Sequence, residues 1–164
     1  MITLPTVAFT GTRQGMTLAQ VQTVGQLCAK LNTKFGTVAS HHGACHGADR
    51  QFHVIAREMG WRIDLWPSNN DQQEWAASQS MWAVIHDISP PLTRNDSMIQ
   101  LSDVAIAAPS GFFELQRGSG TWATFRYMFK KGGPTFVCYP DGTFEVVHHI
   151  KGLPHGTHNS TPIR

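Results

Sequence analysis

Hydrophobic and polar positions along this chain follow two periods, one typical of β-strands and one typical of α-helices. Short runs rich in Val, Ile, Phe and Thr are mostly closed by Gly or Pro, residues that commonly mark turns. The last run follows Pro140-Asp141-Gly142, a tight-turn signal, and we expect it to return as a hairpin. The runs predict strands at residues 6–10, 37–40, 61–66, 104–108, 135–139 and 143–147.

Helical spacing accounts for the segments between these strands. Thr17 can cap a helix, because its hydroxyl accepts a hydrogen bond from a first-turn N–H, and Val21, Val24 and Cys28 then share one face. Residues 72–86 fit a helical face only in part. We expect helices at 17–31, 49–59, 97–102 and 123–131, with a less regular helix at 72–86.

This alternation predicts an α/β fold, a three-layer arrangement in which helices cover both faces of a mainly parallel sheet. In such sheets, ligands bind beyond the carboxyl ends of the strands. Three polar, glycine-bearing loops fall at that edge, at residues 11–13, 43–49 and 114–121. Together the three loops indicate a binding site, although each alone is also typical of a plain turn.

The glycine turn at 117–122 carries the clearest chemical signal. It reads Arg117-Gly118-Ser119-Gly120-Thr121-Trp122 and joins the strand at 104–108 to a helix. Glycines let a ligand approach the backbone, and a helix start offers unpaired N–H groups and a positive dipole end. These properties favour an anion, most often a phosphate.

The first loop, Gly11-Thr12-Arg13, has two interpretations. Gly11 could let a ligand approach the backbone, Thr12 could donate a hydrogen bond, and Arg13 could make two hydrogen bonds to a phosphate. The alternative is a turn with a solvated arginine. The chain has neither the GxGxxG spacing of a dinucleotide fold nor a Walker sequence.

The second loop contains Gly43, Ala44, Gly47 and Asp49 and could face a phosphate or a sugar. Asp49 could hydrogen-bond a ribose hydroxyl, or it could cap the following helix. We interpret Cys45 as a small buried cysteine, because no group is placed to orient a neighbouring base.

Histidines near this loop raise the question of a metal. Four potential ligands fall within six residues, without the two separated pairs of usual structural zinc sites. We therefore expect no metal site and no cofactor. The ligands considered are His41, His42, Cys45 and His46.

Three further residues are candidates near the same edge. Arg94 can fork onto a phosphate and Asn95 can donate to and accept from a base or ribose, unless Asn95 simply caps a helix. Glu114 could act as a general base or stabilise positive charge on a sugar. Alternatively, Glu114 pairs with Arg117 or Arg126.

Four motifs, in this order, resemble those of the SLOG superfamily, Rossmann-like domains related to Lonely-guy phosphoribohydrolases and to DNA-processing protein A. Together they span residues 7 to about 140, and the closest likeness is to small single-domain members from bacteria and phages. The motifs are Phe-Thr-Gly-Thr-Arg at 9–13, His-Gly-Ala-Cys-His-Gly-Ala-Asp at 42–49, Pro-Leu-Thr-Arg-Asn at 91–95 with 102–107, and Arg-Gly-Ser-Gly-Thr-Trp-Ala-Thr at 117–124.

The resemblance implies a nucleotide pocket within a single domain at 1–147, followed by a polar tail at 148–164. It implies that the turn at 118–121 binds phosphate. The hydrolases carry a catalytic Glu where this chain has Thr124, and a Gly where it has Arg117. The expected ligand-binding residues are Gly11, Thr12, Arg13, Gly43, Ala44, Gly47, Asp49, Asn95, Arg117, Gly118, Ser119, Gly120 and Thr121.

Two functions follow from these residues. The missing Glu favours a protein that senses or sequesters a nucleotide-derived ligand, such as a nucleoside phosphate or a molecule like NAD or ADP-ribose. The alternative is an enzyme that cleaves the N-glycosidic bond of a nucleotide, with Glu114 and Arg94 as its catalytic residues.

Composition changes this picture little. The formal net charge is +2 and no long basic run occurs, which argues against a nucleic-acid partner or a membrane surface. Three cysteines without a CxxC spacing, and an N-terminus without a signal-peptide pattern, indicate a cytoplasmic protein. Five Trp and the irregular segment 68–90 suggest apolar surface for a homodimer or higher homo-oligomer.

Overall fold

The computed structural model describes residues 4–114 and 119–148. Its strands form a seven-stranded sheet in the order β4-β3-β2-β1-β5-β6-β7. Neighbouring strands are parallel except β6 and β7, which form an antiparallel hairpin. The strands are β1 Thr6–Gly11, β2 Ala39–His42, β3 Arg62–Leu65, β4 Ala83–Ile85, β5 Val104–Ala108, β6 Thr135–Cys138 and β7 Phe144–Val147. The helices are α1 Leu18–Phe35, α2 Ala48–Glu58, α3 Asn70–Ser78, α4 Pro91–Gln100 and α5 Gly120–Lys131.

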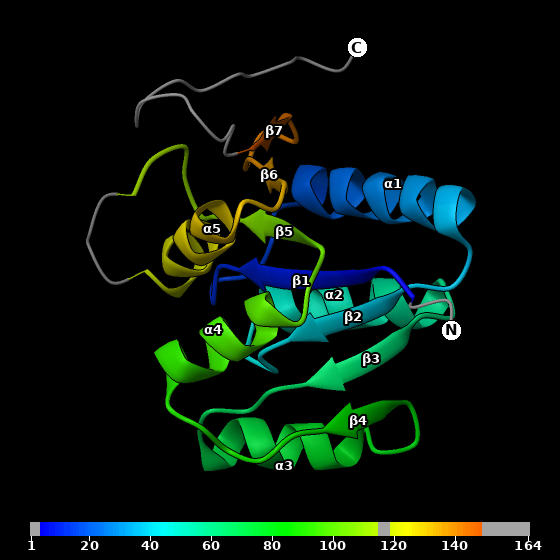
Figure 1. Cartoon of the computed structure of the whole chain (residues 1–164), viewed down its shortest axis with the longest axis vertical. Coiled ribbons are helices and arrows are strands. Elements are labelled where there is room, and N and C mark those ends of the chain that lie inside the picture. Colours follow the sequence, from blue (N-terminus) through cyan, green and yellow to red (C-terminus); the bar gives the residue numbers. More distant parts are fainter. Residues whose placement is uncertain (1–3, 115–118, 149–164) are drawn as a thin grey trace.

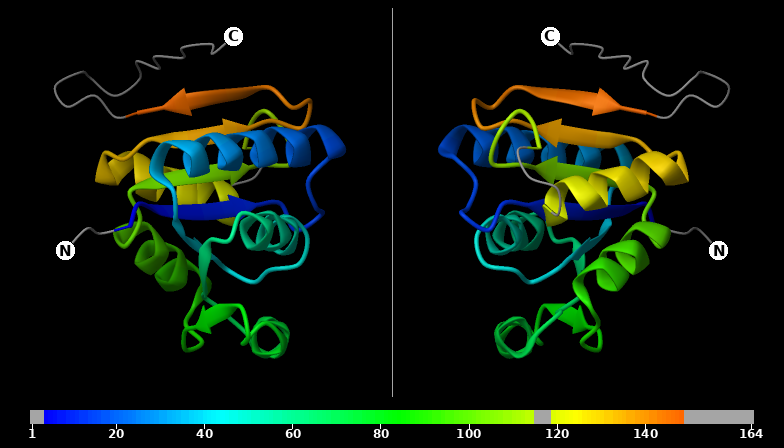
Figure 2. Two further views of the ribbon diagram at one scale, coloured as in Figure 1. Left: turned by 90° about the vertical axis from the view of Figure 1, so that its right-hand side faces the viewer. Right: turned by 90° about the vertical axis from the view of Figure 1, so that its left-hand side faces the viewer.

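Helices cover both faces of this sheet, which confirms the predicted three-layer α/β fold. On one face α1, α2 and α3 pack around Phe9, Phe52 and Ile106 in the larger core. On the other face α4 and α5 enclose a smaller cluster that includes Ile99 and Met128. Figure 1 shows the elements, and Figure 2 shows α1 and α2 on one side and α4 and α5 on the other.

β1 lies at the point where the direction of the chain across the sheet reverses. The chain runs outward from β1 through β2 and β3 to β4, then returns to place β5 on the other side of β1. The loops that follow β1 and β5 therefore diverge to opposite faces. A crevice opens between such loops at the carboxyl edge, where ligands bind in sheets of this kind.

Two predicted boundaries at the start of the chain are wrong by several residues. Thr17 and Gln20 form the capping box of α1, as its cap predicted, but the helix continues to Phe35 and ends at Gly36, whose φ is +73°. Because the helix is longer, β2 begins at Ala39 rather than at residue 37. His41 and His42 are consequently strand residues and not part of the following loop.

The predicted helix at 72–86 is right only over its first half. α3 ends at Ser78, and Ala83–Ile85 form β4, a short edge strand parallel to β3. Side chains of Met81, Trp82 and Val84 are exposed around it. The partial match to a helical face arose because two elements share this stretch.

A third boundary affects the candidate site. α4 begins at Pro91, well before the predicted residue 97, because proline is well tolerated in the first turn of a helix. Arg94 and Asn95 therefore lie within the helix, and the interpretation of Asn95 as its cap is wrong. Both side chains are buried.

Some predictions fall outside the described residues. Most of the expected polar tail, residues 149–164, lies there, as do Arg117 and Gly118. Within residues 4–114 and 119–148, no helix is long and apolar enough to cross a membrane. The cytoplasmic location stays a prediction.

Candidate functional site

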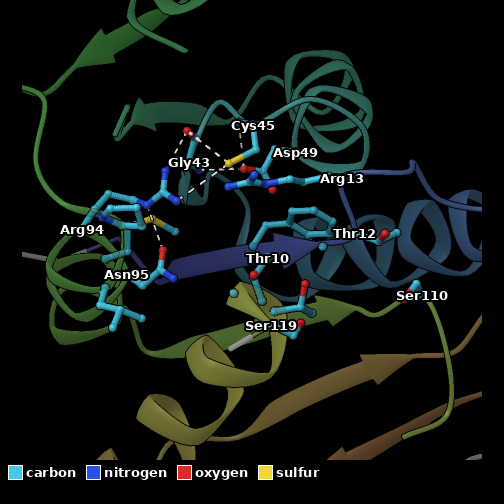
Figure 3. A pocket seen from close by; sticks show the side chains of 17 residues that line it. Thr10, Thr12, Arg13, Gly43, Cys45, Asp49, Arg94, Asn95, Ser110 and Ser119 are labelled. Carbon is cyan, nitrogen blue, oxygen red and sulfur yellow. Dashed lines mark hydrogen bonds between the residues drawn. The ribbon is translucent and has the colours of Figure 1, made fainter. Parts of the chain in front are cut away.

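A cavity of about 570 Å³ opens at the carboxyl end of β1. Its walls come from the loops after β1 and β2, from α4, and from the start of α5. Figure 3 shows side chains from these separate elements turned toward one space. The lining residues are Phe9, Thr10, Gly11, Thr12, Arg13, Gly43, Cys45, Asp49, Pro91, Leu92, Arg94, Asn95, Met98, Ser110, Ser119, Gly120 and Thr121.

The turn after β2 is held together by Asp49. One carboxylate oxygen, Oδ2, accepts hydrogen bonds from the N–H groups of Gly43 at 3.0 Å and Cys45 at 3.2 Å. Gly47 occupies the N-cap position of α2, so the alternative that Asp49 caps this helix is wrong. Burial raises the pKa of Asp49 to about 6, although Arg94 and the two N–H groups oppose the rise.

Arg94 links α4 to this turn. Its Nη1 donates to the carbonyl of Gly43 at 2.9 Å and to that of Trp66 at 2.8 Å, and its Nε donates to Oδ1 of Asn95 at 2.8 Å. The remaining nitrogen, Nη2, has a contact of 3.8 Å with Sγ of Cys45. Most of the guanidinium is thus used to hold the wall in place, and only Nη2 remains for a ligand.

The loop after β1 is fixed by its backbone. The N–H of Thr12 donates to Ala108 of β5, and its carbonyl accepts from Gly15 and from Ala48. Gly11 is needed here because a Cβ would lie 2.4 Å from Cβ of Ala48. The loop therefore ties three elements together while the Arg13 side chain remains exposed.

The α5 wall differs in having few side chains. Ser119, Gly120 and Thr121 line the cavity where the helix begins. First-turn N–H groups of an α-helix have no partner within the helix. Thr124, at the position of the hydrolase Glu, is buried and donates its hydroxyl to the carbonyl of Gly120 at 2.8 Å.

Three predicted site residues do not line the cavity. Ala44 is fully buried and Gly47 packs against the backbone of Arg13. Glu114 forms an ion pair with Arg126 of α5, as one alternative proposed. The cavity brings together the other described candidates: Gly11, Thr12, Arg13, Gly43, Asp49, Arg94, Asn95, Ser119, Gly120 and Thr121.

Sequence reasoning missed several lining residues. Thr10 is the last polar side chain of β1 before Gly11, so its place in the strand was an available signal. Cys45 lines the cavity but its burial raises the pKa of the thiol to about 11, which leaves it protonated. Leu92 and Met98 follow from α4 beginning early, and no local pattern indicated them.

A buried histidine pair supports the turn from beneath. Nδ1 of His42 accepts the N–H of Ala44 at 3.2 Å, so Nε2 carries the proton and donates to Nδ1 of His53 at 3.0 Å. Burial lowers the pKa of His42 well below its usual value and that of His53 to about 4. In the described part of the chain, no cluster of three or more His, Cys, Asp or Glu could hold a metal.

A mainly parallel sheet with a cavity at its point of reversal and a helix start in one wall defines a Rossmann-like α/β domain. Known structures share this fold. DNA processing protein A from Streptococcus pneumoniae matches over 82% of this chain and 50% of its own, at 16% identity and a TM-score of 0.61. The Helicobacter pylori protein of the same name matches over 82% and 65%, at 24% identity and a TM-score of 0.58.

A third structure, the structural-genomics target TM1055, matches over 80% of this chain and 72% of its own, at 14% identity and a TM-score of 0.55. These matches confirm the Rossmann-like α/β fold that the resemblance implied. The chain spans half to about two thirds of the two DNA processing proteins. No family model and no curated protein matches the sequence.

The comparisons correct one expectation. The near-balanced charge argued against a nucleic-acid partner, but two of the structural neighbours are DNA processing proteins, and the Helicobacter pylori protein binds single-stranded DNA. Net charge alone does not exclude such a partner, because it sums the whole chain and does not describe the charge at one site. Nucleic acid therefore belongs among the candidate ligands.

Proposed function

We propose that the cavity binds a nucleotide or a nucleotide-derived ligand, with a phosphate at the first turn of α5. The single observation that carries this proposal is the position of that helix start, which opens into the cavity beside β1. Unpaired N–H groups and the helix dipole favour an anion there. Such a domain, at residues 1–147, would sense or sequester a nucleoside phosphate or a ligand like NAD or ADP-ribose.

Binding is better supported than cleavage of the N-glycosidic bond. Glu114 lies outside the cavity lining and is engaged by Arg126. Thr124 has its hydroxyl directed to a backbone carbonyl. Arg94 has most of its donors engaged by the protein. The carboxylate that lines the cavity among the described residues is Asp49, and it is tied to two backbone N–H groups.

A single strand of DNA is the second candidate ligand. Likeness to two DNA processing proteins supports it, one of which binds single-stranded DNA. Both candidates present the same chemistry to α5, a phosphate with an adjoining sugar. They differ beyond the phosphate, where a small molecule ends and a DNA strand continues into further nucleotides. One experiment can therefore separate them.

The test measures binding of AMP, ADP-ribose, NAD and a short single-stranded DNA oligonucleotide by calorimetry and by the shift in melting temperature. A ligand at a hundred times its Kd should stabilise the folded state by about 2.7 kcal/mol. Chromatography of the same mixtures then checks for a released base. Release would favour the enzyme, whereas unchanged ligand with a raised melting temperature supports binding.

The Gly120→Asp variant tests the position of the phosphate. We expect it to abolish binding of every phosphate-bearing ligand, because it places a negative charge at the helix start. The fold should survive, since Asp is favoured in the first turn of a helix. Gly120→Ala is the matched control, because a Cβ there is 4.0 Å from its nearest neighbour. Wild-type affinity in Gly120→Asp would rule out this phosphate site.

Self-association remains a proposal. Exposed apolar side chains gather in and near the segment 68–90, among them Met81, Trp82, Val84 and Ile88. They support the expected homodimer or higher homo-oligomer, which sedimentation velocity can measure directly.

A further inference from the structure

The cavity has a polar corner opposite the start of α5, formed by Gly43, Cys45, Asp49 and Arg94. Gln72 does not line the cavity but supports this corner, with its Oε1 3.4 Å from Nη1 of Arg94. Asp49, Gln72 and Arg94 are 4–5% exposed, so their positions are set by the protein rather than by solvent. Figure 3 shows Cys45, Asp49 and Arg94 together on one side of the cavity and Thr10 and Ser119 on the other. A ligand with its phosphate at α5 would therefore direct another part toward this corner.

Hydrogen bonding within the corner leaves a defined set of groups for a ligand. Asp49 uses Oδ2 for two backbone N–H groups, and neither of these two bonds occupies its Oδ1. Arg94 directs Nη2 only to the sulfur of Cys45, a weak acceptor. The corner therefore offers one strong acceptor and one strong donor.

The charges of the corner favour a neutral group over a second phosphate. A phosphate placed there would meet the Asp49 carboxylate, and Arg94 has already committed Nε and Nη1 to oxygens of the protein. Arg13 reaches toward the corner from the loop after β1, but it is exposed, so water screens its charge. A pair of hydroxyls fits better, because each can donate to a carboxylate and accept from a guanidinium.

We propose that this corner binds the ribose hydroxyls of the nucleotide, so that the protein prefers a ribonucleotide to its 2′-deoxy counterpart. The proposal rests on the proposed function, since it needs a phosphate at α5 to direct the sugar. A hydroxyl between a buried carboxylate and a buried guanidinium makes charge-assisted hydrogen bonds, which are stronger than neutral ones. Removing that hydroxyl would leave Oδ1 of Asp49 without a partner in a site closed by the ligand.

The experiment compares the Kd values of AMP and 2′-deoxy-AMP for the full chain by calorimetry, with CMP and 2′-deoxy-CMP as a second pair. We expect AMP to bind about ten to a hundred times more tightly than 2′-deoxy-AMP, and CMP to show the same preference over 2′-deoxy-CMP. Equal affinities for the ribose and deoxyribose forms would overturn the proposal, as would a preference that depends on the base alone.

Asp49→Asn identifies the residue responsible. The amide keeps an oxygen for the two backbone N–H groups but replaces the free acceptor with a donor, so the ribose preference should fall to about twofold or less while 2′-deoxy-AMP binds as before. Asp71→Asn is the control, because this exposed acid does not line the cavity. An unchanged preference in Asp49→Asn would contradict the assignment.

These outcomes separate the two proposals. If neither AMP nor 2′-deoxy-AMP binds, the proposed function fails and no sugar preference can exist. If both bind equally, the function stands and the sugar assignment is wrong. DNA lacks the 2′-hydroxyl, so a preference for AMP over 2′-deoxy-AMP would also favour a ribonucleotide over single-stranded DNA as the ligand of the cavity. Should Asp49→Asn fail to fold, the wild-type comparison still decides whether the preference exists.

Discussion

On the wall formed by the turn at 43–49 and α4, a methyl group added to either glycine would collide with the protein. A Cβ on Gly43 would lie 2.4 Å from Nη1 of Arg94, and one on Gly47 would lie 2.4 Å from the carbonyl oxygen of Arg13. On the α5 wall, a Cβ on Gly120 would have its nearest neighbour, Nδ2 of Asn95, at 4.0 Å. We call the first the closed wall and the second the open wall.

The difference shows that glycines around one cavity can have two physical purposes. On the closed wall, glycine allows one piece of chain to approach another, and the polar side chains of Asp49 and Arg94 bond mainly to backbone groups. On the open wall, space beside Gly120 and the N–H groups of the helix start remain for a ligand. The closed wall therefore sets the shape of the site, and the open wall is the part suited to bind a negatively charged group of a ligand.

Gly47→Ala should have the largest effect on stability. Gly47 has φ +81° and ψ −123°, a conformation that is strained for alanine, and the added Cβ would meet backbone atoms of the loop after β1. We expect a loss of about 3 kcal/mol or more in the free energy of unfolding. Urea denaturation of wild type and variant measures it.

Two glycines serve as controls for this comparison. Gly120→Ala, on the open wall, should change stability by less than about 0.5 kcal/mol. Gly25→Ala, inside α1 with no neighbour within 4 Å, should stabilise the protein by about 0.5–1 kcal/mol. If Gly47→Ala and Gly120→Ala have the same stability, the distinction between the two walls is wrong.

Three buried histidines, in β2 and α2, should make stability depend on pH. Burial lowers the pKa of His41 and of His53 to about 4 and lowers that of His42 still more clearly, so the unfolded chain binds more protons below pH 6.5. Their contribution is complete above pH 6.5 and is lost as the pH falls toward 4. Asp49, with its pKa raised to about 6, acts in the opposite direction. The stability lost through the three histidines should exceed the stability gained through Asp49, so acidification should lower the melting temperature.

Substitutions of these groups should change that profile in opposite senses. His53→Gln removes one histidine, so the loss of melting temperature between pH 6.5 and 4 should become shallower. Asp49→Asn removes the opposing carboxyl, so the loss should become steeper. A wild-type protein that gains stability over this range would contradict the assignment of neutral buried histidines.

Local signals account for what the sequence predicted well. Thr17 begins α1 because its hydroxyl and Gln20 cap each other, within three residues, and that pattern is visible in the chain. Glycines and prolines at the strand ends placed the three loops at one edge of a parallel sheet. The fold and the position of the cavity follow from these short-range features.

The roles of individual side chains could not be predicted in the same way. Arg94 is separated by 51 residues from Gly43 and by 28 from Trp66, so its partners depend on the finished fold. Asp49 contacts residues only four and six positions away, but only a particular backbone turn directs both N–H groups to one oxygen. β4 has only three residues, of which Val84 is exposed and the other two are partly buried, so it carries no clear period.

Glu114→Gln should have the smallest effect on stability and on ligand affinity, although the sequence analysis proposed Glu114 as a catalytic residue. Its ion pair with Arg126 is partly solvated, with side chains 20% and 51% exposed, and such pairs contribute about 0–1 kcal/mol. Because Glu114 does not line the cavity, ligand affinity should stay within about twofold of wild type. Arg126→Gln is the matched control, since it breaks the same pair from the other side. A loss of affinity or turnover in Glu114→Gln but not in Arg126→Gln would contradict this prediction. It would show that Glu114 acts on the ligand at the open wall.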